Sequence, residues 1–204
     1  MNIILLSTAA VLGLLAFFEP CTIATHTLFA VRTHQATLPQ RWLALLQLVL
    51  PRMALLAILF GSAAWVGLSA ISQHQALFML GMIGAIYLLT RKIYLPVPHL
   101  EFFRLLPGHE GLSQGLKLGL TLPACTLPLV AVVGVIAALS QQPATALFAG
   151  IIFAAMFSLP TLWNSVRGLD AAHRRFLGKA ASVSPYITAL LLWGAALMIL
   201  ITGV

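Results

Sequence analysis

Charge is what this chain has least of. Only 7% of its 204 residues are charged, and just four are acidic, whereas soluble domains carry about 25% charged residues. Hydrophobic residues make up 61%, which excludes a water-soluble globular domain. A bilayer core takes roughly 20 apolar residues per helix, and the period-2 alternation of a membrane barrel is absent. We therefore predict an all-α membrane protein with six transmembrane helices.

Cysteine is also scarce: the chain has only Cys21 and Cys125. A quinone-coupled enzyme that works alone needs a second pair of thiols to pass electrons on, so any partners must bring their own. The first ten residues lack Lys and Arg and thus the basic start of a signal peptide. We expect the first apolar stretch to be retained.

The apolar stretches define six predicted spans with one polar connection longer than the rest. That connection, residues 94–114, is broken up by Pro96, Pro98, Pro107 and Gly108. The predicted spans are Asn2–Val31 (interrupted near Pro20), Pro51–Ala70, Ala76–Thr90, Gly115–Leu139, Ala144–Asn164 and Pro185–Thr202.

The positive charges predict the orientation. All eleven Lys and Arg residues lie in or beside the first, third and fifth connections, with Arg52 assigned to the end of the first. Because Lys and Arg accumulate in cytoplasmic loops, both termini are expected outside. The same distribution, without a basic run that interleaves with aromatic residues, argues against binding of nucleic acid.

Three spans followed by three spans can be related only by an inverted repeat, as in many transporters. We predict repeats at residues 1–93 and 115–204, joined by a cytoplasmic linker at residues 94–114. Cys21 lies eleven residues before Arg32 and Cys125 eight after Lys117. At the helical rise, both lie about 12–17 Å from the basic boundary, near the midplane.

Each cysteine stands in a similar proline-flanked motif. Cys21 follows Glu19-Pro20 and precedes Thr22, while Cys125 lies in Pro123-Ala124-Cys125-Thr126-Leu127-Pro128. Proline breaks or kinks a helix, and two thiols at one depth pair only if their Cα atoms approach within about 7 Å. The sequence indicates one buried dithiol that undergoes thiol–disulfide exchange without a cofactor.

This layout resembles the CcdA family, which is related to the central membrane domain of DsbD. The resemblance implies a thiol–disulfide oxidoreductase that carries electrons from cytoplasmic thioredoxin to an extracytoplasmic thioredoxin-like acceptor. It also implies a role in cytochrome c maturation or disulfide reduction, alternating access of the cysteine pair, and a lipid-embedded location in a bacterial inner membrane.

Two polar residues near Cys21 leave alternatives open. Glu19 is the one acidic residue within a predicted span, where carboxylates are costly and often functional. It is either a proton acceptor for Cys21 or a cap of the resumed helix. A soft-metal transporter with Cys21, Cys125, Glu19 and His26 as ligands is a second hypothesis. A scaffolding membrane protein with incidental cysteines is a third.

Overall fold

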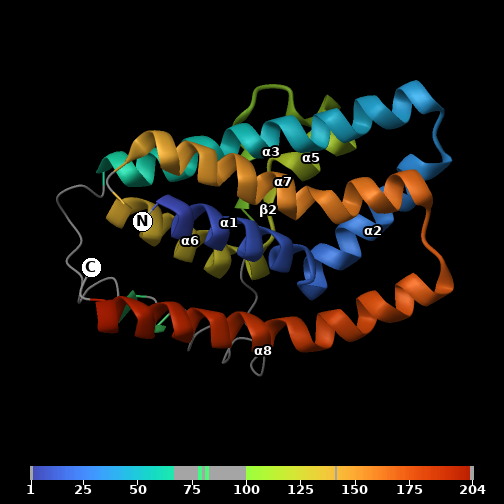
Figure 1. Cartoon of the computed structure of the whole chain (residues 1–204). Helices are drawn as coiled ribbons and strands as arrows, with labels where there is room; N and C mark the ends of the chain where they lie inside the picture. Colours follow the sequence, from blue (N-terminus) through green and yellow to red (C-terminus); the bar gives the residue numbers. More distant parts are fainter. Residues whose placement is uncertain (1, 67–77, 80, 83–99, 141, 203–204) are drawn as a thin grey trace.

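The computed structural model describes residues 2–66, 78–79, 81–82, 100–140 and 142–202 (Figure 1). The structure is mostly helical, and its long helices run along one common direction. In chain order its elements are α1 (Asn2–Phe17), α2 (Pro20–Gln35), α3 (Leu38–Val66), β1 (Leu100–Glu101), the 3-10 helices η1 (Phe102–Leu105) and η2 (His109–Gly111), α5 (Gln114–Gly119), β2 (Thr121–Leu122), the 3-10 helix η3 (Ala124–Thr126), α6 (Leu127–Ser140), α7 (Pro143–Arg167) and α8 (Ala171–Thr202).

The predicted interruption of the first span is present. Helix α1 ends at Phe17 and α2 begins at Pro20, with an angle of 73° between them. Glu19 has extended backbone angles, as expected for a residue before proline. Pro20 is tolerated in the first turn of α2 because the amide it lacks would have no partner there. Cys21 therefore lies at the start of a new helix.

Helices α3 and α7 pack side by side along much of their length (Figure 1). Phe60 of α3 meets Phe153 of α7 edge to face, with ring centroids 5.9 Å apart. The two backbones approach most closely at Gly150, where an added Cβ would lie 2.4 Å from the carbonyl oxygen of Leu56. Helix α1 packs against α7 in the same way, through Gly13.

The second cysteine also lies at a break in the helix, as its flanking prolines predict, within the predicted span Gly115–Leu139. Helix α5 ends at Gly119, and β2, η3 and then α6 follow. Strand β2 pairs antiparallel with β1, so that Leu100 faces Leu122. The break has a local cause, because Pro123 cannot donate an amide hydrogen bond.

Helix α8 runs along the outside of the bundle (Figure 1). It begins at Ala171, well before the predicted start at Pro185. The start of α1 and the end of α8 lie at the same end of the molecule, opposite the α2–α3 and α7–α8 connections (Figure 1). These two connections carry the basic residues Arg41 and Arg167 at or beside them.

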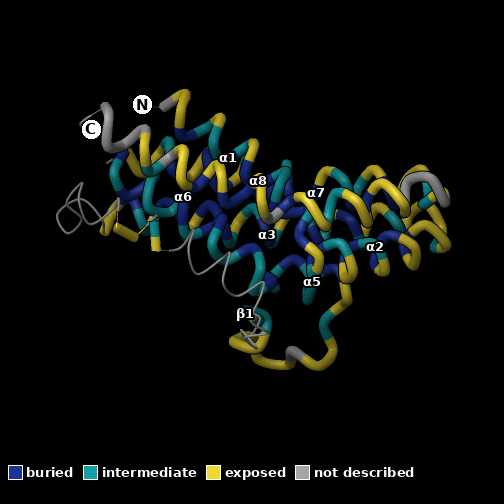
Figure 2. Tube along the Cα trace, turned by 90° about the horizontal axis from the view of Figure 1, so that it is seen from below, coloured by how far each residue is buried: buried dark blue, intermediate teal, exposed yellow. Residues whose placement is uncertain are grey.

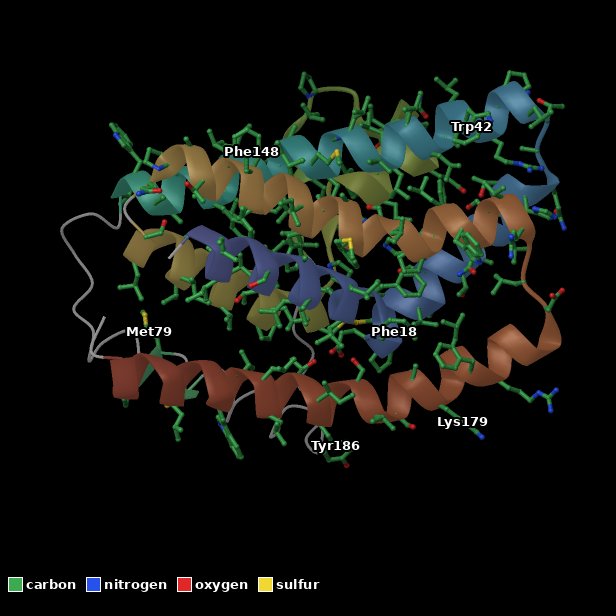
Figure 3. All side chains as sticks on the ribbon, viewed as in Figure 1. Phe18, Trp42, Met79, Phe148, Lys179 and Tyr186 are labelled. Atoms are coloured by element: carbon green, nitrogen blue, oxygen red, sulfur yellow. A yellow bond between two sulfur atoms is a disulfide. The ribbon has the colours of Figure 1, made fainter. Side chains whose placement is uncertain are left out.

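The buried residues in the interior of the bundle (Figure 2) are mostly apolar, and many of the exposed residues on its outer surface are apolar as well. Trp42 of α3, Phe148 of α7 and Tyr186 of α8 are all exposed and point away from the bundle (Figure 3). So many exposed apolar side chains exceed what a soluble protein normally shows, and they fit a lipid environment.

The described residues supply two to four of the six predicted spans. Helices α3 and α7 are each long and apolar enough to cross a membrane, and α1 with α2 and the two halves of α8 add two bent pairs. Helix α3 begins at Leu38, earlier than the predicted Pro51. The predicted third span, Ala76–Thr90, lies outside the described residues except for 78–79 and 81–82. These candidate spans indicate a membrane protein.

Candidate functional site

The two cysteines meet although 104 residues separate them. Cys21 and Cys125 form a disulfide with a Cα–Cα distance of 6.8 Å. Cys21 comes from the first turn of α2, and Cys125 from η3, just before α6 begins. Both residues are half-buried. The structure thus brings together the two residues that the sequence singled out, each beside a break in a helix.

The supporting residues of the two motifs shape the backbone around the pair. Thr126 donates both its amide and its hydroxyl to the carbonyl oxygen of Pro123, at 3.0 and 2.8 Å, which closes the turn that holds Cys125. Pro128 lies in the first turn of α6, where a missing amide has no cost. The hydroxyl of Thr22 lies 3.8 Å from the sulfur of Cys125, so it links the first motif to the second.

Glu19 is buried at the break between α1 and α2, with 1% of its surface exposed. It occupies the position before α2, but its side chain makes no capping hydrogen bond. Instead its Oε1 accepts hydrogen bonds from Ser184 at 3.3 Å and Thr188 at 3.5 Å, both on α8. The carboxylate therefore joins the start of α2 to α8.

His26 lies one helical turn beyond Thr22 and is fully buried. Its Nε2 lies 3.2 Å from Nη2 of Arg52, and its Nδ1 lies 2.6 Å from the hydroxyl of Thr161. Arginine can only donate, so Nε2 must accept, and Nδ1 carries the proton and donates to Thr161. His26 is therefore a polar group that faces the interior of the bundle.

Arg52 is the residue that the sequence interpretation misplaced. It lies in the middle of α3, fully buried, and not in a connection. Its Nη1 donates to Ser158 at 3.3 Å and its Nη2 to the carbonyl oxygen of Leu118 at 2.8 Å. The guanidinium also stacks over the ring of Phe157 at 4.3 Å. The apolar residues on both sides of Arg52 in the sequence are the signal that could have placed it within a helix.

The four ligands of the soft-metal hypothesis are not gathered into one site. Cys21 and Cys125 are bonded to each other, His26 contacts Arg52 and Thr161, and the carboxylate of Glu19 faces α8. Among the described residues no group of three or more His, Cys, Asp or Glu side chains is placed to hold a metal ion.

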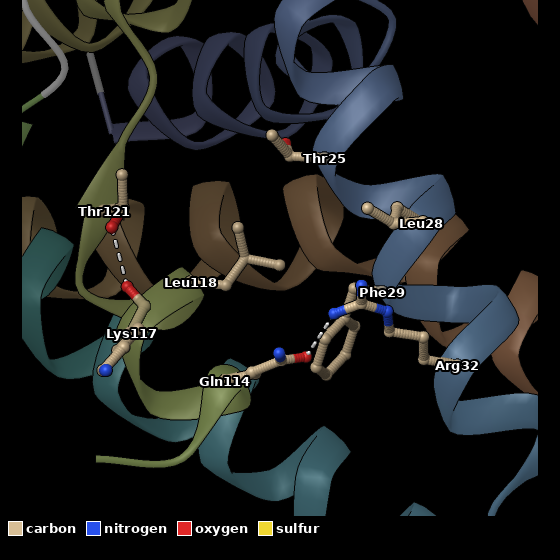
Figure 4. Close-up of a pocket in the computed structure, with 8 residues that line it drawn as sticks. All are labelled: Thr25, Leu28, Phe29, Arg32, Gln114, Lys117, Leu118 and Thr121. Atoms are coloured by element: carbon tan, nitrogen blue, oxygen red, sulfur yellow. Dashed lines mark hydrogen bonds between the residues drawn. The ribbon is translucent and has the colours of Figure 1, made fainter. Parts of the chain in front are cut away.

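A pocket of about 270 Å³ opens between the two segments that carry the cysteines (Figure 4). Thr25, one turn after Cys21, lines one wall, and Thr121, four residues before Cys125, lines the other. Arg32 and Lys117 also line the pocket. The further lining residues, most of them apolar, are Leu28, Phe29, Gln114 and Leu118. Arg32 Nη1 donates to Gln114 Oε1 at 3.1 Å across the opening.

The chain matches no protein-family model, no curated protein and no solved structure. The fold and the site define its class on their own: a helical protein of membrane type, with one cysteine pair where two interrupted helical segments meet.

Proposed function

We propose that this protein is a membrane carrier of reducing equivalents that works by thiol–disulfide exchange between Cys21 and Cys125. The observation that carries the proposal is the disulfide between two proline-broken segments 104 residues apart. Ordinary buried cysteines have no reason to meet at such breaks. A pair held in irregular backbone can also open and close without disrupting a continuous helix.

The exchange needs no cofactor, because a dithiol and a disulfide exchange two electrons directly. A thiolate of the donor attacks one sulfur of the Cys21–Cys125 bond and forms a mixed disulfide, and the other cysteine leaves as a thiolate. The donor's second thiolate then resolves the mixed disulfide. The donor is oxidised to a disulfide, and the carrier is reduced to two thiols that take up the two protons that the donor released. The reverse sequence with an oxidised acceptor restores the carrier.

We propose cytoplasmic thioredoxin as the donor and an extracytoplasmic thioredoxin-like protein as the acceptor, across a bacterial inner membrane. In this arrangement six spans form two inverted repeats with both termini outside and residues 94–114 in the cytoplasm. Two features support it: the basic α2–α3 and α7–α8 connections lie opposite the chain ends, and each half of the chain carries one interrupted segment with one cysteine.

The pocket beside the pair supports entry of the donor from the basic end. It lies within one helical turn of Cys21 and is flanked by Arg32 and Lys117, which favour an acidic partner through electrostatic complementarity. Its apolar floor suits the hydrophobic surface that commonly surrounds a reactive thiol in a redox protein.

The test is a count of free thiols in the protein purified in detergent. Alkylation and mass spectrometry before and after incubation with reduced thioredoxin should show no free thiol at first and two afterwards. A thioredoxin that lacks its resolving cysteine should become trapped on the wild type. Neither Cys21→Ser nor Cys125→Ser should trap it when the remaining thiol is kept reduced. A bridge that thioredoxin leaves intact in the folded protein would overturn the proposal.

A further inference from the structure

Arg52 is an unusual group to find in the interior of this bundle. A guanidinium is always protonated in proteins, and a buried charge is costly unless a countercharge accompanies it. Arg52 is fully buried, yet no acidic side chain is among the hydrogen-bond partners that the structure describes for it, and its Nε has none at all there. Its partners are His26, Ser158 and the carbonyl oxygen of Leu118, all of which are neutral.

The position of this charge relates it to the cysteine pair. Through His26 the guanidinium contacts α2 five residues after Cys21, and through Leu118 it contacts α5 seven residues before Cys125. It is thus held between the two segments that carry the thiols. The helical rise over five residues plus the reach of the side chains puts it on the order of 10 Å from the pair.

We propose that Arg52 is the fixed positive charge that stabilises the thiolate formed at Cys125 when the disulfide opens. The inference rests on the proposed function and assigns a positioning residue to it. Cys125 is the sulfur that leaves as thiolate because Thr22 places a hydroxyl 3.8 Å from it, and that hydroxyl donates to the developing charge. Cys21 then carries the mixed disulfide.

The magnitude follows from Coulomb's law. Two unit charges about 10 Å apart, at the effective dielectric constant of about 20 that suits protein interiors, interact strongly enough to change an ionisation equilibrium by about tenfold. A distance twice as long would leave an effect near threefold. The proposal therefore predicts about a tenfold change in the thiolate fraction at a given pH.

The other charged groups around the pair have to be distinguished from Arg52. Among the described residues these are Glu19, whose carboxylate faces α8, Arg32 and Lys117 at the pocket, and Glu101, which pairs with Arg104 on the strand beside Thr121. His26 is the one further titratable group, and it contacts Arg52 itself. Helices α1 and α6 carry none, and Lys179 of α8 points away from the bundle (Figure 3). The expected signature is thus specific to the charge at position 52.

The experiment uses chemically reduced protein in detergent, in the Cys21→Ser background, so that Cys125 is the single thiol. The rate of alkylation by iodoacetamide is measured against pH, which reports the thiolate fraction. Arg52→Gln should move the midpoint of this profile up by about one pH unit and lower the rate near neutral pH about tenfold. Arg52→Lys should return the midpoint close to its wild-type position, whereas Lys179→Gln, which removes a charge that points away from the bundle, should leave the midpoint in place.

A second variant covers the case in which Arg52→Gln does not fold. Ser158→Asp places a carboxylate beside Nη1 of Arg52 and cancels its charge, while it supplies the missing countercharge; the midpoint should again move up. An unchanged midpoint in either folded variant overturns the proposal and leaves Arg52 as a structural tie between α3, α5 and α7. No partner protein is involved, so failure of the thioredoxin test would not be confused with failure of this one.

Discussion

The contact between α3 and α7 at Gly150 offers a quantitative test of the bundle. An alanine methyl group there would lie 2.4 Å from the carbonyl oxygen of Leu56 and 2.6 Å from the Cα of Ala57. Favourable contacts between carbon atoms lie at about 3.5–4.0 Å, so the two backbones would have to separate by about 1 Å. Both neighbours are backbone atoms and cannot rotate away as a side chain could.

Gly150→Ala should therefore destabilise the protein by about 1–3 kcal/mol, the usual cost of overpacking a well-packed contact. The separation would also affect the site, because Arg52 lies one turn before Leu56 on the same helix. Its 3.3 Å hydrogen bond to Ser158 of α7 spans the interface that the methyl group would widen.

The assay is thermal unfolding in detergent, followed by circular dichroism, with the disulfide kept oxidised throughout. Gly134→Ala in α6 is the matched control, since a methyl group there would meet no atom within 4 Å. It adds the same atoms to a helix and should leave the midpoint of unfolding unchanged or slightly raised. If Gly150→Ala unfolded at the wild-type temperature, α3 and α7 could not pack as closely as described.

Two further predictions concern the surroundings of the disulfide. Glu19→Gln should slow thiol–disulfide exchange several-fold and flatten its pH profile if the carboxylate accepts the proton of Cys21; Glu110→Gln is the control, and an unchanged rate and profile would reject the relay. Arg32→Glu combined with Lys117→Glu should slow reduction by thioredoxin about tenfold at low salt and less at high salt, since steering by charge is screened by ions. The same rate in this double variant and the wild type would place the donor elsewhere.

The parts of the fold that the sequence predicted well are those governed by local chemistry. Proline restricts its own backbone and that of the residue before it, so the break at Pro20 could be located to within a few residues. Helix α7 was similarly accessible: Pro143 starts it, and its observed range, Pro143–Arg167, extends the predicted Ala144–Asn164 by only a few residues. The approach of Cys21 to Cys125 followed from matching motifs at matching depth.

The parts that were missed depend on contacts between distant segments. Arg52 was assigned to a connection because charge normally avoids an apolar interior, and its neutral partners on α2, α5 and α7 are not evident from the sequence near it. The apolar run Trp42–Leu50 argued against this assignment, because a connection that ends at Arg52 would have to include nine mostly apolar residues. The break at Cys125 was predicted from its prolines, but the extent of the irregular backbone between Gly119 and Leu127 was not, because β2 pairs with the distant β1.

Among the described residues, Glu19 and Arg52 are the two buried side chains with a formal charge. Glu19 and Arg52 could have neutralised each other, which is how proteins usually lower the cost of burying ionic groups. Instead the carboxylate lies two residues before Cys21 and is held by hydroxyls of α8, while the guanidinium is held by α2, α5 and α7. A negative charge this close to Cys21 disfavours a thiolate on that sulfur. The position of Glu19 thus favours Cys125 as the sulfur that leaves in the proposed exchange, and it gives the two chemically identical cysteines different roles.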